Sequence, residues 1–237
     1  ADLLRLLGRD PGNRDKPPRE SRRSDIPDVS SAPKRACGTP ETSVPGDHLR
    51  LLRDVVDHPA SGVTERYRRL DLSRRKGTKL KQELIKGGFA TDIDVPLPGG
   101  RVTLLEPTGT GFAAIGMKQI PPRAGGAVHR FWVARIAETF RKRGLKVRFE
   151  APVGEGRAID LVAERAGEKV AVEVEVSGRR LKESIRKLAA QKNCRRVVAC
   201  ASSTVLERAR SWLDSESTGS DIELVHAWSL ISKQRTE

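Results

Sequence analysis

Apolar residues are sparse over the first 45 positions of the chain, where a leucine-rich turn at positions 3–7 is followed by charged residues, serines and seven prolines. A segment of this kind buries too little apolar surface to offset the entropy lost when it becomes ordered. The pattern therefore predicts a disordered arm or linker over residues 1–45.

From Gly46 onward the apolar residues recur at the three- and four-residue spacing of an amphipathic helix. One apolar face ends at the break over 58–62, and it consists of Leu49, Leu52, Val55 and Val56. Helical spacing returns over residues 63–70, and again from Ser73, a residue type that caps helices, to the glycines at 87–88. The pattern predicts three short helices.

The spacing of apolar residues then changes to every second position, which is typical of a β-strand. Residues 92–97 alternate, a Pro-Gly-Gly turn follows at 98–100, and residues 101–105 return as the second strand of a hairpin. A small helix over 108–116 closes the segment. Three short helices followed by a β-hairpin predict a winged-helix domain, which we place at residues 46–120.

A run rich in proline and glycine at 121–126 marks the boundary to a second domain over residues 126–237. Beyond this run we expect, in chain order, a helix, three strands, a helix, a strand, a helix and a strand at residues 128–143, 146–151, 158–163, 169–177, 179–191, 195–201, 205–213 and 222–227. The predicted order is αβββαβαβ. The chain as a whole is therefore predicted to combine α+β and α/β folds.

The charge balance of the chain narrows its candidate partners. Lysine and arginine number 45 against 31 aspartates and glutamates, a net charge of +14, so nucleic acid is the first candidate partner and an anionic membrane surface the second. Three cysteines without a Cys-x-x-Cys pair exclude a disulfide framework and a cysteine zinc site. No apolar run reaches the ~18 residues of a membrane span, so we expect a soluble, cytoplasmic protein. The start at Ala1 instead of Met is typical of a piece of a longer protein.

The candidate chemistry lies in two predicted apolar strands that carry acids. Side chains of a strand alternate between its faces, so Glu173 and Glu175 share one face, and Asp160 on the preceding strand reaches the same end of the sheet. Three carboxylates suit Mg²⁺ or Mn²⁺, and such an ion activates water and binds a phosphodiester oxygen. The alternative is a hairpin with solvated acids. The valines around the acids disfavour it, because a buried carboxylate needs a partner or a metal.

This stretch resembles the catalytic core of the PD-(D/E)xK, or restriction-endonuclease-like, nucleases over roughly residues 126–201. The resemblance implies an αβββαβ core in which Asp160 and Glu173 bind the metal. Members of the family usually have a lysine two residues after the glutamate, where it positions the attacking water. This chain has Glu175 at that position, a departure that a minority of members share.

The missing lysine leaves three alternatives open. Glu175 is a further metal ligand or the water-orienting base, or Arg186 or Lys187 of the next helix replaces the lysine, or the domain no longer cleaves. In the family the first helix often carries an acid near the metal, and in this chain His129 or Arg130 could approach the phosphate instead. For His129 we favour a helix-capping or surface role.

A second candidate site is the basic segment over residues 65–86, in which nine cations accompany three acids. In a winged helix the third helix enters the major groove of DNA. The residues expected to contact bases or phosphates are Arg74, Arg75, Thr78 and Lys79 on that helix and Arg101 at the wing. The pattern of residues 47–116 also resembles the winged-helix domains of multiple-antibiotic-resistance-type regulators. The alternative is a solvated basic helix in a domain that contacts protein.

Both candidate sites together predict a DNA-binding endonuclease that depends on Mg²⁺ or Mn²⁺, acts on double-stranded DNA and has no membrane partner. Its predicted catalytic residues are Asp160, Glu173, Glu175 and Lys187, the first three also as metal ligands. Further candidate partners are a translocase ATPase or another DNA-processing protein, and a second copy of the chain. The main alternative is a non-catalytic DNA-binding or docking module with a degenerate nuclease fold, and a third is a protein-interaction domain that meets an acidic partner.

Overall fold

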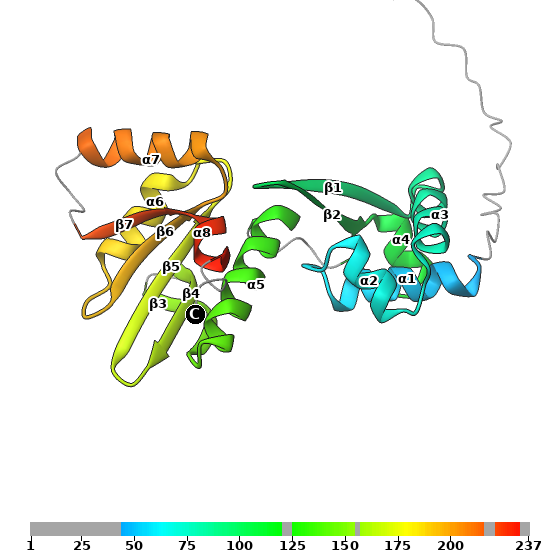
Figure 1. Cartoon of the computed structure of the whole chain (residues 1–237), viewed down its shortest axis with the longest axis horizontal. Coiled ribbons are helices and arrows are strands. Elements are labelled where there is room, and N and C mark those ends of the chain that lie inside the picture. The colour runs from blue at the N-terminus through cyan, green and yellow to red at the C-terminus, as the bar shows by residue number, and fades with distance from the viewer. Residues whose placement is uncertain (1–43, 120–124, 155–156, 216–220, 233–237) are drawn as a thin grey trace, which may run out of the picture. The chain divides into compact units, whose positions relative to one another are not determined.

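The computed structural model describes residues 44–119, 125–154, 157–215 and 221–232 (Figure 1). Apart from its last two residues, the arm predicted over residues 1–45 lies outside the described residues. Contacts along the chain group Ser43–Glu237 as one unit, and the domain boundary expected at 121–126 stays a prediction. In these described ranges no helix is both long and apolar enough to cross a membrane.

The first half of the described chain contains the helices and the hairpin that the spacing of apolar residues indicates. In chain order they are α1 (Gly46–Asp57), α2 (Val63–Arg69), α3 (Arg74–Lys86), β1 (Ala90–Leu97), β2 (Gly100–Pro107) and α4 (Gly109–Ala114). Ser73 caps α3, because its hydroxyl accepts the backbone N–H of Lys76 at 3.2 Å. The hairpin is longer than the alternation suggests, since its antiparallel pairing extends to Ala90 and Pro107.

Apolar side chains from the helices and the hairpin form the core of this half. Its buried members are Leu51, Leu52, Val55, Leu80, Leu84, Ala90, Leu105 and Ile115. The apolar face of α1 is rotated from the expected one, because Leu51 is buried while Leu49 and Val56 are only partly covered. The helix and its approximate bounds follow from the sequence. Which of its residues lie at the centre of the buried face depends on the elements that pack against it.

The second half begins with a long helix and continues with strands and helices. In chain order they are α5 (Ala127–Lys142), β3 (Lys146–Gly154), β4 (Arg157–Arg165), β5 (Glu168–Glu175), α6 (Leu181–Ala189), β6 (Arg195–Cys200), α7 (Ser203–Ser215), β7 (Ile222–His226) and α8 (Ala227–Ser232). The short helix α8 has no counterpart among the expected elements. The mixed α and β class of the chain is confirmed.

One five-stranded sheet, in the order β3-β4-β5-β6-β7, organises the second half. β3, β4 and β5 pair antiparallel, while β5, β6 and β7 pair parallel. Helices α5 and α8 cover one face of the sheet and α6 and α7 the other (Figure 1). Both faces are therefore buried, which explains the nearly continuous apolar character of the central strands.

The alternation of side chains along β5 places two acids under α6. Val172 and Val174 pack in the core with α5, and Ala171 packs in the core with α6 and α7. Glu173 and Glu175 follow Ala171 at every second position, so they share its face. Both glutamates are buried, with 2% and 5% of their surface exposed.

Candidate functional site

Strands β4 and β5 separate at the position where Asp160 and Glu173 stand. Their ladder runs from Arg165–Glu168 to Leu161–Val172 and then stops. Beyond it, the backbone N–H of Asp160 donates to Glu173 Oε1 at 3.3 Å, and the N–H of Val174 donates to Asp160 Oδ2 at 2.8 Å. Each carboxylate thus accepts a backbone N–H that the sheet leaves unpaired, and this exchange fixes both acids at the opening between the strands.

His129, in the first turn of α5, approaches this opening from the other face of the sheet. Its Nε2 lies 3.0 Å from Asp160 Oδ2, and only 17% of its side chain is exposed. Gly125 makes the approach feasible, because a Cβ at this position (φ +84°) would lie 2.4 Å from the imidazole ring. The capping or surface role favoured from the sequence is therefore wrong. Arg130 does not join the acids and pairs with Glu106 of β2.

Helix α6 supplies two polar side chains to the same acids. Ser184 is buried, and its hydroxyl lies 2.6 Å from Glu175 Oε1 and 3.0 Å from Glu173 Oε2. Lys187, one turn further on, donates to Glu173 Oε2 at 2.6 Å and to the carbonyl of Ala158 at 3.1 Å. Of the two basic residues that could replace the missing lysine, the structure brings Lys187 to the acids.

The sequence indicated Arg186 as a candidate and did not indicate Ser184, but of these two residues the structure brings only Ser184 to the acids. Arg186 is exposed, and within the described chain it makes no contact with the carboxylates. Ser184 was not among the predicted site residues. One feature of the sequence could have indicated it, because it is a polar residue on an otherwise apolar helix face with Leu181, Ile185 and Leu188. Polar residues at such positions need hydrogen-bond partners, and here both partners are acids.

Burial changes the protonation of the two glutamates. Desolvation, and after it the charge of Asp160, raises the pKa of Glu173 to about 7, although the Lys187 ammonium acts in the opposite direction. Desolvation also raises the pKa of Glu175, against the lowering effect of the Ser184 hydroxyl. Near neutral pH the cluster can therefore hold or release a proton at Glu173. Perturbed carboxyl groups of this kind are frequent at catalytic sites.

The donor set allows a test of whether Mg²⁺ or Mn²⁺ fits here. Within the described ranges, no group of three or more His, Cys, Asp or Glu side chains is arranged to hold a metal ion. Mg²⁺ in enzymes often binds through only one or two carboxylates and keeps several waters. Asp160 offers its free Oδ1 to such an ion, whereas Glu173, whose two oxygens already accept hydrogen bonds, would bind it through a remaining lone pair, and the full set with Glu175 stays a prediction.

Two carboxylate oxygens of the cluster remain available to a ligand. Among the described residues, no donor contacts Asp160 Oδ1 or Glu175 Oε2, whereas the other four oxygens are engaged. The hydrogen bonds therefore orient each of these two acids and leave one oxygen of each for a cation or a water molecule.

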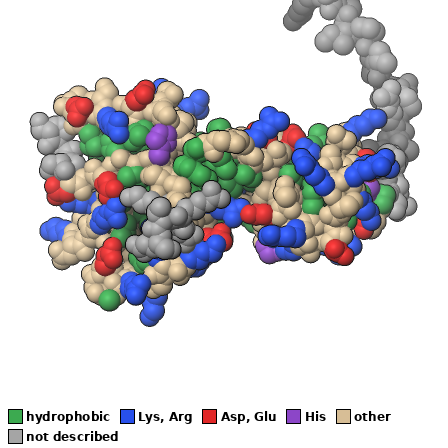
Figure 2. Space-filling model, in the orientation of Figure 1, with side chains coloured by type: hydrophobic (Ala, Val, Ile, Leu, Met, Phe, Trp, Pro, Cys, Tyr) green, Lys and Arg blue, Asp and Glu red, His purple; other side chains and the backbone are tan. Residues whose placement is uncertain are grey.

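The basic residues expected to meet DNA lie on α3 and on the hairpin. Arg74, Arg75 and Lys79 are exposed, and Arg101 is exposed beside Asp94 at 3.2 Å. Thr78 is half-buried, so its side chain is less available to DNA than those of Arg74, Arg75 and Lys79. Figure 2 shows Lys and Arg side chains gathered over this region.

Two arginines of the same basic segment hold the domain together. Arg66 is fully buried and donates to Asp54 Oδ2 at 2.8 Å, to the carbonyl of Asp54 at 2.7 Å and to that of His58 at 2.7 Å. Arg69 donates to Asp54 Oδ1 at 2.6 Å. These two cations tie α2 to α1, so the charge available on the surface is smaller than the sequence count indicates.

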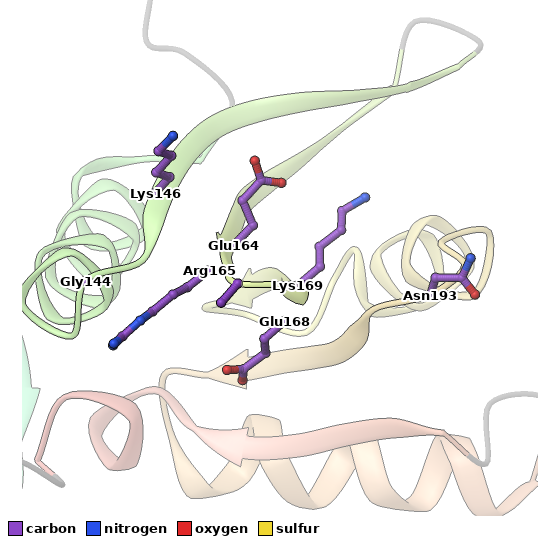
Figure 3. A pocket seen from close by; sticks show the side chains of 9 residues that line it. Gly144, Lys146, Glu164, Arg165, Glu168, Lys169 and Asn193 are labelled. Carbon is purple, nitrogen blue, oxygen red and sulfur yellow. The ribbon is translucent and has the colours of Figure 1, made fainter.

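A separate pocket of about 490 Å³ opens at the opposite end of the sheet from the acids (Figure 3). It is lined by the start of β3 and the turn between β4 and β5, with Gly144, Lys146, Glu164, Arg165, Ala166, Gly167, Glu168, Lys169 and Asn193. Glu168 begins β5 and Glu175 ends it, so the pocket does not contribute to the carboxylate cluster.

Comparisons with known proteins give little beyond this geometry. No protein-family model matches the chain, and no curated protein matches it. Among solved structures, the chain is similar to protein VC1899 from Vibrio cholerae, with 12% identity and a TM-score of 0.36. The similarity covers 80% of this chain and 56% of that one, so the chain spans little more than half of its length. Neither a fold nor a function can be transferred at this level of similarity.

Proposed function

We propose that the chain is a DNA-binding endonuclease that depends on Mg²⁺ or Mn²⁺ and hydrolyses a phosphodiester bond. One observation carries the proposal: two strands separate at Asp160 and Glu173, and Lys187 reaches the same point from α6. An acid pair with an adjacent ammonium has the charges that phosphodiester hydrolysis needs, since the acids bind a cation and the ammonium stabilises a phosphate oxygen.

The proposal includes a specific role for each side chain of the cluster. Asp160 and Glu173 would hold the ion, which supplies water activation and charge neutralisation when bound. Lys187 takes the place of the family's lysine from another element, and Glu175 orients water with its free oxygen. His129 and Ser184 keep the carboxylates in position through the contacts at 2.6–3.0 Å.

The proposed fold assignment is a winged helix followed by a restriction-endonuclease-like core. Three helices and a hairpin in the first half support the former, and the order αβββαβ with its sheet supports the latter. Arg74, Arg75, Lys79 and Arg101 would then contact the DNA backbone or bases while the second half cuts.

Cleavage of supercoiled plasmid with Mn²⁺ or Mg²⁺ tests the proposal. We expect nicking by the parent chain and a loss of about 100-fold or more for Asp160→Asn, because the charge stabilisation supplied by the ion that Asp160 would hold is of this scale. Glu164→Gln, an exposed change on the same strand, is the control and should cleave normally. Cleavage that survives Asp160→Asn would remove this residue from the mechanism.

A matched pair of substitutions on α6 tests whether Lys187 acts in place of the lysine that the family usually has at the position of Glu175. Lys187→Gln should reduce cleavage about as strongly as Asp160→Asn, whereas Arg186→Gln, one residue away on the exposed face, should reduce it only slightly. Equal effects of the two substitutions would show that positive charge on α6, and not the contact at Glu173, is what matters.

A second candidate function is a non-catalytic DNA-binding module. Glu175 in the place of the family's lysine favours it, together with the lack, in the described ranges, of a three-residue metal group. This alternative predicts salt-sensitive binding of duplex DNA and no cleavage with either metal.

A further inference from the structure

Six exposed cations lie in the loop after β5 and on the outer surfaces of α6 and α7. We call this the α6–α7 basic surface, and it consists of Arg179, Arg180, Lys182, Arg186, Arg208 and Arg210. Only two acids, Glu183 and Glu207, lie within the same stretches, residues 177–189 and 203–210. Within the described chain none of the six cations forms an ion pair, so their charge is available to a ligand.

Two contacts join α7 to α6 and to the loop after β5. Arg208 of α7 donates to the carbonyl of Ser177, in the loop between β5 and α6, at 3.2 Å. Lys182 of α6 lies over the ring of Trp212 of α7, with its Nζ 5.8 Å from the ring centroid. Both helices cover the same face of the sheet (Figure 1). A ligand on α6 would therefore also meet the cations of α7.

The α6–α7 basic surface borders the carboxylate cluster. Arg180 precedes Ser184 by one turn, and the N–H of Ser184 donates to the carbonyl of Arg180 at 2.9 Å. Residues four apart lie on the same side of a helix, about 6 Å apart along its axis. Ser184 contacts Glu173 and Glu175, so Arg180 stands one helical turn before the residue of α6 that reaches the acids. Arg179 follows Glu175 by only four residues.

We infer that the α6–α7 basic surface binds the phosphodiester backbone of the nucleic acid strand whose bond lies at Asp160 and Glu173. The inference rests on the proposed function and names a second contact surface for the same substrate, apart from α3. A polyanion that approaches the acids is repelled by them, and the unpaired cations of the loop after β5, α6 and α7 offset this repulsion. An acidic protein surface would also meet these cations, but it offers no phosphodiester to the adjacent acids.

Binding of a fluorescent 20-base-pair duplex in EDTA tests the inference, with Asp160→Asn as the parent so that no cleavage occurs. The test variant adds Arg179→Ala and Arg180→Ala, and the control adds Lys146→Ala and Lys192→Ala, which remove the same charge at the opposite end of the sheet. The affinity is measured against salt, because each lost phosphate contact lowers the slope by about 1.

We expect the test variant to bind about tenfold more weakly than the parent at 0.1 M salt and to lose about two units of slope. The control should change by less than about twofold, and thermal unfolding should show that both variants are folded. The inference fails if the test variant keeps the parent's slope and affinity, or if the control loses as much.

Two further outcomes separate this inference from the proposed function. If the parent binds no duplex, both the inference and the DNA-binding function are overturned, whereas unchanged binding by the test variant overturns the inference alone.

Loss of binding only to vesicles that contain phosphatidylserine, with duplex binding intact, would assign the surface to a membrane. Loss of binding only to polyglutamate would assign it to an acidic protein.

Discussion

Ser184 has one hydroxyl proton and stands between two buried carboxyl groups. A hydroxyl has one proton to donate, so a proton on one of the two glutamates would make the second contact a full hydrogen bond as well. The raised pKa of Glu173, to about 7, is consistent with this shared proton. At the scale of single residues, the cluster is therefore a set of hydrogen bonds that holds like charges together.

Replacement of Ser184 by alanine should loosen this arrangement. We expect Ser184→Ala to lower the free energy of unfolding by about 1–2 kcal/mol, because a buried hydrogen-bonding group is lost, and to reduce cleavage about tenfold. The measurements are urea unfolding and plasmid nicking. Ser215→Ala, which removes an exposed hydroxyl bonded to the carbonyl of Trp212, is the control and should change neither. A Ser184→Ala variant with normal cleavage would show that the hydroxyl does not position the acids.

The protonation of Glu173 makes a prediction about pH. Its pKa is higher in the folded chain, about 7, than its ordinary value of 4.5, so the folded state binds more protons between these values. Stability from this group is fully present below pH 4.5 and is lost as the pH rises through 7. Glu173→Gln should therefore gain stability relative to the parent from pH 4.5 to 8, on the order of 3 kcal/mol.

The measurement is urea unfolding of both chains across this pH range. Glu164→Gln, at an exposed position of the neighbouring strand, is the control and should keep the parent's pH profile. A constant difference between the parent and Glu173→Gln at every pH would contradict a raised pKa at Glu173.

At the scale of elements, α3 contains a glycine that its propensity does not explain. Gly77 stands in the interior of a 13-residue helix, where glycine costs roughly 1 kcal/mol relative to alanine. The ring of Tyr67 in α2 explains it, because a Cβ on Gly77 would lie 2.5 Å from that ring. The close contact of α2 and α3 thus requires a residue without a side chain.

Gly77→Ala should therefore destabilise the chain although alanine is the better helix former. We expect a loss of about 1–3 kcal/mol in the free energy of unfolding, because overpacking displaces the tyrosine ring. Chemical denaturation measures the loss. Gly46→Ala, at a helix start where no atom lies within 4 Å of the added Cβ, is the matched control and should be neutral or slightly stabilising. Equal stability of the two variants would refute the proposed contact.

The elements themselves were largely predictable from the sequence, because their spacing of apolar residues is a local property. The register of β5 followed from alternation alone and correctly placed Glu173 and Glu175 on one face. The contacts of His129 and Ser184 with the acids were not predictable, since they depend on how α5 and α6 pack on the sheet. The structural roles of Arg66 and Arg69 could not be predicted for the same reason, because a sequence does not distinguish a buried cation from a solvated one.

At the scale of the whole molecule, the chain has a net charge of +14, and its cations are of two kinds. Some, such as Arg66, Arg69 and Lys187, compensate buried acids. Others, on α3 and on the α6–α7 basic surface, are exposed, and they give the chain the field that attracts a polyanion. Of the acids that matter for the proposed chemistry, Glu173 and Glu175 are buried and Asp160 is half-buried.

Binding of Mn²⁺, followed by electron paramagnetic resonance, tests the central claim most directly, because it asks whether Asp160 and Glu173 form a cation centre without relying on cleavage. We predict one site in the parent chain, with at least tenfold weaker binding in Asp160→Asn and Glu173→Gln and unchanged binding in Glu164→Gln. No binding by the parent, or equal binding by all four chains, would contradict the account.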